Sequence, residues 1–286
     1  MKIGVIGAGA MGSGIAQAFA QHEGYTVVLC DIKAEYAQRG RRRIAESLDK
    51  LVERGRRSQE EVDAVLANIT AGTNEDAADC DLVIEAALED LEIKKQLFSK
   101  LNDICQKNAI FATNTSSLSI TELSYGLGRP VIGMHFFNPA PVMKLVEVVG
   151  GLHTSEELIN EIKRIVESIG KVPVVVQDSA GFIVNRMLIP LINEAVGILR
   201  EGVASAEDID IAMKLGANLA MGPLELGDLI GLDVCLAIMN ELHKETGDDK
   251  YRPHPYLRKL VRGGVWGRKT GQGFYTYPKN QDPPRR

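Results

Sequence analysis

Residues 2–20, KIGVIGAGAMGSGIAQAFA, join a short apolar run to a glycine-rich turn and then to a segment with helical spacing of apolar side chains. A second apolar run at residues 25–31 follows, so the N-terminus reads as a strand, a helix and a second strand. Strands that are joined through a helix pair in parallel. The pattern therefore predicts an α/β domain built on a parallel sheet.

The turn has the spacing G-x-G-x-x-G between strand and helix, the context in which this motif binds a dinucleotide. Gly7 would permit the tight turn, Gly9 would let the backbone approach a pyrophosphate, and Gly12 would let helix and strand pack closely. Ala10 and Met11 complete the predicted coenzyme site at the helix N-terminus, whose N–H groups attract phosphate. The alternative is a tight turn in an α/β protein that binds no ligand.

Asp31 closes the second strand, 19 residues after Gly12. Its carboxylate is placed to accept hydrogen bonds from a ribose diol and would repel a 2′-phosphate. The sequence therefore favours NAD over NADP as the coenzyme. The nearby Lys33 keeps NADP open as an alternative.

Beyond this unit the chain has an α/β part and a helical part. Further strand-like runs occur at residues 82–86, 110–114, 131–136, 145–149 and 172–176. After residue 178 such runs stop, and helical spacing follows at residues 182–201, 206–215 and 232–244. We predict an N-terminal Rossmann-type, doubly wound sheet over residues 1–180 and an all-α C-terminal domain over residues 181–286.

Composition excludes several classes of protein. A net charge of −5 and a pI near 5.7 provide no basic field for nucleic acid. No apolar run is long enough for a membrane span or resembles a signal core, so we expect a cytoplasmic protein without membrane contact. The four cysteines have neither paired nor metal-ligand spacing, and we predict no disulfide and no metal site.

The segment GMHFFNP, residues 133–139, places His135 at the end of an apolar strand beside aromatic rings. An imidazole can take the proton of an alcohol as hydride leaves carbon, and can return it in the reverse direction. Glu147 lies in the next apolar strand, LVEVV, where a carboxylate needs a partner. We predict that the two side chains pair, which would fix the imidazole tautomer. A purely structural pair is the alternative.

Two further polar positions are ambiguous by themselves. Asn114 and Ser116 follow a strand, at the edge of the sheet where ligands bind in doubly wound folds, but a strand-to-helix turn with a hydroxyl cap has the same appearance. Asn185 lies in a mostly apolar helical segment, and its amide can equally be bonded within a core.

With these motifs in view, the sequence resembles the 3-hydroxyacyl-CoA dehydrogenase family, most closely its bacterial short-chain members. The likeness extends over nearly the whole chain. It is carried by GAGAMGSGIA, DLVIEAALED, TNTSSLSI, GMHFFNPAPVMKLVEVV, GFIVNR, DIDIAMKLGA, MGPLELGD and GRKTGQGFY, in that order. It implies an NAD-binding Rossmann domain, a helical domain that commonly mediates dimerisation, and acetoacetyl-CoA or 3-hydroxybutyryl-CoA as substrate, bound between the two domains.

The resemblance also implies a role for individual residues. His135 would be the acid/base and Glu147 the residue that orients it. Three polar side chains would hold the 3-oxygen and thioester region of the substrate: Ser116, Asn138 and Asn185. Three others would contact the coenzyme: Glu89, Lys94 and Asn114. Without the resemblance, Glu89 and Lys94 would be interpreted as an exposed helical ion pair.

A basic segment precedes residue 58, and within it Arg43, Ser47, Lys50 and Arg54 recur at helical spacing and so share one face. The resemblance implies that Ser47 and Arg54 touch coenzyme A, and Lys50 belongs to the same predicted phosphate-binding face. The alternative is a helix face that is merely solvated.

Two rival functions stay open at this point. One is an NAD-dependent dehydrogenase of a free 3-hydroxyacid, a class that relies on a lysine. The other is a non-catalytic NAD-binding structural protein.

Overall fold

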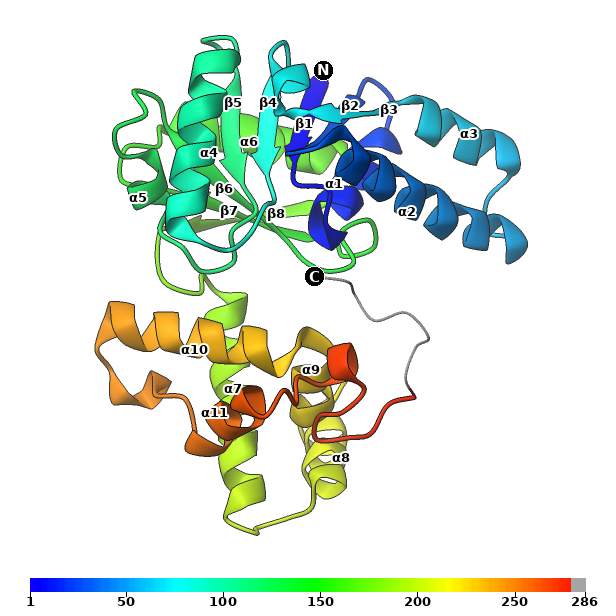
Figure 1. The fold of residues 1–286 in the computed structure, drawn as a ribbon. Helices are drawn as coiled ribbons and strands as arrows, with labels where there is room; N and C mark the ends of the chain where they lie inside the picture. Colours follow the sequence, from blue (N-terminus) through cyan, green and yellow to red (C-terminus); the bar gives the residue numbers. More distant parts are fainter. Residues whose placement is uncertain (279–286) are drawn as a thin grey trace. The chain divides into compact units, whose positions relative to one another are not determined.

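The computed structural model describes residues 1–278, which form two compact units. The first unit comprises Met1–Ser179, and the second begins at Ala180. Figure 1 shows the helices and strands of both units.

The first unit is built on one eight-stranded sheet with the order β3-β2-β1-β4-β5-β6-β7-β8. All neighbouring strands are parallel except β6 and β7, which pair antiparallel. The strands are β1 (Lys2–Ile6), β2 (Thr26–Asp31), β3 (Ile69–Thr73), β4 (Leu82–Glu85), β5 (Ile110–Thr113), β6 (Val131–Phe136), β7 (Leu145–Gly150) and β8 (Val172–Gln177). The predicted Rossmann-type sheet is confirmed.

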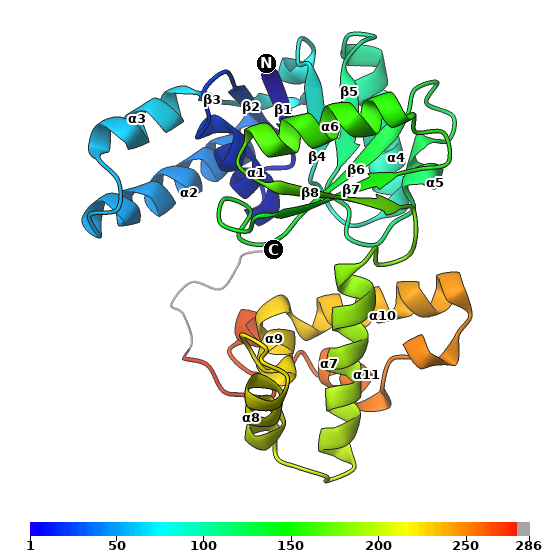
Figure 2. The same cartoon turned by 180° about the vertical axis from the view of Figure 1, so that it is seen from behind.

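Helices cover both faces of this sheet (Figures 1 and 2). They are α1 (Ala10–Ala20), α2 (Ala34–Glu53), α3 (Gln59–Ala67), α4 (Leu91–Ile104), α5 (Ile120–Ser124) and α6 (Glu156–Ser168), with a short 3-10 helix, η1, at Asn74–Ala77. Successive strand residues alternate between two cores: Val5 packs in the core that contains α1 and α6, whereas Ile6 packs with Phe98 of α4. The sheet is therefore doubly wound.

The strand order reverses beside β1, because β2 and β3 lie on one side of it and β4 on the other. In open α/β sheets, ligands bind outside the carboxyl ends of the strands at such a switch point. The glycine turn follows β1 directly at this point. The fold thus directs attention to the carboxyl ends of β1, β2, β4 and β5.

Strand β3 was not predicted from the sequence. Its residues, ITAGT, include a glycine and form an edge strand whose side chains are only partly buried. Such a strand lacks the continuous apolar run from which the central strands were predicted.

Helices are the regular elements of the second unit's described residues, apart from isolated β-bridges at Gly267–Gln272 and Gln272–Thr276, which confirms the predicted all-α fold. Its helices are α7 (Val184–Arg200), α8 (Ala206–Gly216), α9 (Pro223–Ile230), α10 (Leu232–Thr246) and α11 (Pro255–Arg262), with short 3-10 helices η2 (Asp249–Tyr251) and η3 (Arg268–Thr270). The fully buried Asp228 of α9 accepts hydrogen bonds from the backbone of Phe274 and Tyr275 and from the hydroxyl of Tyr277. These bonds tie the segment after η3 to the helical core.

Cys30, Cys80, Cys105 and Cys235 are buried as free thiols. Burial raises the pKa of the Cys30 thiol to about 12, so the thiol is protonated and unreactive at neutral pH. Among the described residues, none of the helices has the length and apolarity that a bilayer crossing demands.

Candidate active site

The glycine turn has the geometry that a dinucleotide needs. Gly7 has a φ of +101°, in the region that glycine adopts without strain, and a Cβ at Gly12 would lie 1.8 Å from the Gly7 carbonyl oxygen. A Cβ at Gly9, by contrast, would meet no atom within 4 Å in the described part of the chain. Gly7 and Gly12 are therefore required by the protein itself, whereas Gly9 leaves space above the N-terminus of α1. Ala10 and Met11 form the first turn of that helix.

Asp31 lies beside this turn, at the carboxyl end of β2. One of its carboxylate oxygens accepts from the Ala8 N–H at 2.8 Å, and the other accepts from the Ile32 N–H at 2.8 Å. These bonds fix the carboxylate, and each oxygen retains a lone pair for a ribose hydroxyl. The position fits the role predicted for Asp31.

A pocket of about 190 Å³ adjoins Gly7 and Asp31. Its walls include the apolar side chains of Ala87, Ile93 and Leu97. Asn74 also lines it, and the buried Oδ1 of this residue has no hydrogen-bond partner among the described residues. An apolar slot with one unsatisfied acceptor suits a flat aromatic base that carries an amino group. The residues of this edge therefore fit an adenine dinucleotide.

His135 and Glu147 form a buried pair on the two antiparallel strands. They lie directly opposite each other in the ladder between β6 and β7. His135 Nδ1 is 2.7 Å from Glu147 Oε2, and the side chains are 7% and 1% exposed. The ring of Phe137 packs on the imidazole with the ring centroids 4.5 Å apart. The carboxylate makes the tautomer with hydrogen on Nδ1 the favoured one, so that Nε2 is the nitrogen suited to exchange a proton.

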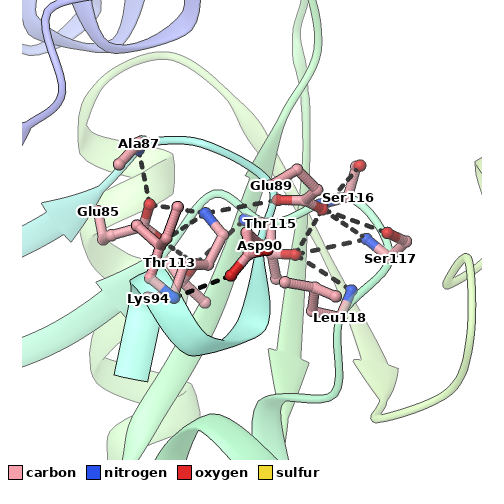
Figure 3. Close-up of polar contacts among 11 residues, drawn as sticks. Glu85, Ala87, Glu89, Asp90, Lys94, Thr113, Thr115, Ser116, Ser117 and Leu118 are labelled. Atoms are coloured by element: carbon pink, nitrogen blue, oxygen red, sulfur yellow. Dashed lines mark hydrogen bonds and ion pairs between the residues drawn. The ribbon is translucent and has the colours of Figure 1, made fainter. Parts of the chain in front are cut away.

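Ser116 belongs to the serine loop, residues 114–119, which follows β5. The loop folds around the Glu89 carboxylate (Figure 3). Glu89 Oε1 accepts from the backbone N–H and hydroxyl of Ser116 at 2.7 and 3.0 Å, and from the Thr115 hydroxyl at 2.7 Å. The N–H and hydroxyl of Ser117 complete the set at 3.2 and 3.3 Å. Glu89 is thus tied to the residue that was predicted to hold the substrate oxygen.

Lys94 on α4 is only 1% exposed, so the interpretation of Glu89 and Lys94 as an exposed helical ion pair is wrong. Its ammonium donates to both carboxylate oxygens of Glu85 at 2.6 and 2.8 Å and lies 3.4 Å from Glu89 Oε2. Partial burial raises the pKa of Glu89, but the nearby Lys94 and the hydroxyl and amide donors outweigh it, and the pKa lies below its ordinary value.

Sequence reasoning missed Glu85. It is fully buried at the carboxyl end of β4, where it also accepts from the Thr113 hydroxyl and the Ala87 N–H, each at 2.6 Å. The signal that identified Glu147, a carboxylate in a strongly apolar strand, is present here too, in DLVIEA.

The three asparagines occupy different positions. Asn114 Oδ1 accepts from the Phe136 N–H at 2.8 Å, which ties the end of β5 to the strand of His135. Asn138 follows β6 and is exposed. Asn185 lies in the first turn of α7, in the second unit. The first two are thus close in the fold to the buried pair, while the third belongs to another body.

The basic face lies on α2. Ser47 and Lys50 are exposed on this helix, and Arg54 caps its C-terminus, also exposed. Arg43 departs from this group, because its guanidinium donates to the Ala8 carbonyl oxygen at 3.2 Å and so turns toward the glycine turn. Exposed cations of this kind suit a phosphate-bearing ligand.

Comparison with known proteins covers the whole described chain. Residues 2–179 match the model of the 3-hydroxyacyl-CoA dehydrogenase NAD binding domain, and residues 181–277 match that of the 3-hydroxyacyl-CoA dehydrogenase C-terminal domain. The chain is 53% identical to 3-hydroxybutyryl-CoA dehydrogenase of Clostridioides difficile, over 98% of this chain and 100% of that protein. It is 42% identical to the human mitochondrial hydroxyacyl-coenzyme A dehydrogenase, over 96% and 90%.

A solved structure is also similar. The crystal structure of (S)-3-hydroxybutyryl-CoA dehydrogenase from Ralstonia eutropha matches with a TM-score of 0.91 and 45% identity, over 97% of this chain and 99% of that one.

Proposed function

Because the chain belongs to the 3-hydroxyacyl-CoA dehydrogenase family, we propose that it interconverts acetoacetyl-CoA and (S)-3-hydroxybutyryl-CoA, with His135 as the acid/base. The protein is an NAD-dependent oxidoreductase. The observation that carries the catalytic proposal is the buried pair of His135 Nδ1 and Glu147 Oε2, 2.7 Å apart.

Bound NAD supplies the nicotinamide that takes or gives the hydride. The residues of the switch point would hold it: the backbone at Gly9 and the N-terminus of α1 would face the pyrophosphate, and Asp31 would accept from the adenosine ribose. The pocket lined by Asn74 would take the adenine. Each of these groups is a fixed part of the first unit.

In the proposed reaction His135 Nε2 takes the proton from the 3-hydroxyl during oxidation and returns it during reduction. Glu147 holds the imidazole and stabilises its positive charge. The amides of Asn138 and Asn185 would donate to the substrate oxygens, where they stabilise negative charge as it develops. The hydroxyl of Ser116 would do the same once it turns from Glu89 to the substrate. Phe137 and the apolar strands around His135 keep water away from it.

Coenzyme A would bind along the exposed face of α2. Ser47, Lys50 and Arg54 would contact its phosphates. A free 3-hydroxyacid has no group that could use this face, and Lys94, which contacts Glu89 beside the serine loop, is buried against Glu85. Both points favour the CoA thioester over the free acid.

The direct test is steady-state reduction of acetoacetyl-CoA by NADH, followed at the NADH absorbance. We expect turnover with the CoA thioester, and kcat/KM for free acetoacetate lower by about 100-fold or more because the CoA contacts are lost. NADPH in place of NADH should be a poor donor, since Asp31 would repel its 2′-phosphate. Equal use of acetoacetate and acetoacetyl-CoA would support the free-acid alternative instead.

Replacing Gly9 with alanine is expected to weaken NADH binding by about tenfold or more while the fold stays intact. Gly9 has a φ of −69° that alanine tolerates, and its Cβ would enter open space where the pyrophosphate must approach. NADH titration and the Tm of the free protein measure both effects. Gly216→Ala, where the added Cβ also meets no atom, is the matched control and should leave NADH affinity unchanged. A Gly9→Ala protein with normal NADH affinity would contradict the proposed pyrophosphate site.

We further propose a homodimer formed through the second unit and a cytoplasmic location. The second unit exposes large apolar side chains, among them Met187 at 72% and Leu215 at 83%, which pairing would cover. Buried free thiols fit a reducing compartment.

A further inference from the structure

The Glu85–Lys94 pair is unusual because it places two opposite charges in the interior without access to water. Glu85 is 0% exposed and Lys94 is 1% exposed. Glu85 accepts hydrogen bonds from Lys94, the Thr113 hydroxyl and the Ala87 N–H. A buried ion pair of this kind is seldom a source of net stability, since desolvation offsets much of the attraction. Its presence calls for a role other than stability.

The ammonium of Lys94 has one further neighbour with negative charge. Beyond Glu85 it reaches Glu89 Oε2 at 3.4 Å, on the side away from β4 (Figure 3). Glu89 in turn gathers the serine loop through its other oxygen, which accepts from Thr115, Ser116 and Ser117. A chain of contacts therefore runs from the end of β4 through α4 to the loop that carries Ser116.

We propose that Glu85 is a positioning residue that acts through Lys94: it holds the ammonium where Glu89 stays ionised and aimed at both the serine loop and the coenzyme. The proposal rests on the proposed function, with Ser116 at the substrate, and on the coenzyme contact that the family resemblance implies for Glu89. Glu85 itself touches neither ligand. Its carboxylate balances the charge of Lys94 in the interior and holds the ammonium within 3.4 Å of Glu89.

The groups around Glu89 set the direction of its titration. Lys94 faces it from α4, with Glu85 of β4 behind the lysine, and the serine loop faces it from β5. Asp90, next in the chain, turns its carboxylate to the Ile93 N–H at the start of α4. Without Lys94, the partial burial that raises the pKa of Glu89 would be opposed by the hydroxyl and amide donors alone. The pKa of Glu89 would then rise.

The test uses the charge-balanced double variant Glu85→Gln/Lys94→Met, which removes both buried charges and so leaves no lone ion in the core. NADH dissociation constants are measured by titration at pH 7.5 and pH 5.5, together with the Tm. The pH ratio is the NADH dissociation constant at pH 5.5 divided by that at pH 7.5. In the wild type the low pKa keeps Glu89 ionised at both pH values, so the pH ratio should be close to that expected without titration of Glu89. In the double variant Glu89 takes up a proton as the pH falls, so the pH ratio should exceed the wild-type value by about threefold or more.

Two further variants make the result specific. Glu122→Gln removes the neighbouring exposed pair of Lys95 and Glu122, 3.0 Å apart, and should behave as wild type. Glu89→Gln removes the titrating group itself and should bind NADH weakly with a ratio no larger than that of the wild type. If the double variant fails to fold, Lys94→Gln, which retains a donor for Glu85, is measured in the same way.

A double variant with wild-type Tm and a wild-type pH ratio would overturn the proposal and leave the pair a structural feature only. The titrations contain no acyl-CoA, so they are independent of the test of the proposed function. Absence of acetoacetyl-CoA turnover in the wild type would refute the substrate assignment, while the pH ratio would still decide the role of the Glu85–Lys94 pair.

Discussion

Replacing His135 with asparagine is expected to lower kcat for acetoacetyl-CoA reduction by about 10²- to 10⁴-fold, the range for loss of a positioned acid/base. The asparagine amide can take the place of Nδ1 and still donate to Glu147, which is 1% exposed and would otherwise be left as a buried charge. It has no nitrogen that can exchange a proton at neutral pH. The variant therefore removes the chemistry and preserves the pairing.

NADH affinity should not change in this variant. The glycine turn follows β1, which is separated from the strand of His135 by β4 and β5. NADH titration, kcat and Tm are measured on the same preparations, with His153→Ala as the control, because His153 is exposed and lies outside the sheet. A His135→Asn enzyme that keeps more than about a tenth of wild-type kcat would remove His135 from the role of acid/base.

The pairing of His135 with Glu147 could be predicted from the sequence because the cost of burial is local. Both residues lie in strands whose other side chains are apolar, and a polar group there needs a partner. The structure supplies the register that sequence reasoning lacked: the strands are antiparallel, and the two residues are direct partners in the ladder. Whether the pair is catalytic stays a prediction.

The Glu85–Lys94 contact could not be predicted in the same way. Lys94 follows Glu89 by five positions in a segment with helical spacing, and the two charges were interpreted as a local, exposed pair. The stronger partner lies on β4, before the helix begins, and only the packing of α4 on the sheet brings the ammonium to it. Tertiary packing outweighed the local pattern here.

The dinucleotide site at the carboxyl edge of the sheet was more predictable, because the positions of glycines indicate the backbone geometry directly. Gly7 and Gly12 are required by a left-handed φ and a close carbonyl oxygen, and the spacing alone indicates both. Arg43 shows where such patterns fail. Helical spacing placed it on the predicted coenzyme A face, but a bond to the Ala8 carbonyl oxygen turns the guanidinium toward the glycine turn.

Replacing Glu147 with glutamine is expected to lower kcat by about 10²- to 10⁴-fold while the KM for acetoacetyl-CoA and the NADH affinity change little. Glutamine keeps the shape and removes the charge. Its amide can still bond to Nδ1, but without the carboxylate charge it no longer stabilises the positively charged imidazole that gives its proton to the substrate oxygen in reduction. The expected loss therefore falls on the chemical step.

The conservative variant Glu147→Asp separates orientation of the imidazole from packing of the core. Aspartate keeps the charge that favours hydrogen on Nδ1, although it is shorter and leaves a small void in the strand layer. If the carboxylate acts through His135, kcat should be higher for aspartate than for glutamine, even though its Tm is lower. If Glu147 only fills space, the order of kcat should follow the order of Tm. Glu161→Gln on the exposed side of α6 is the control and should match wild type in both measurements.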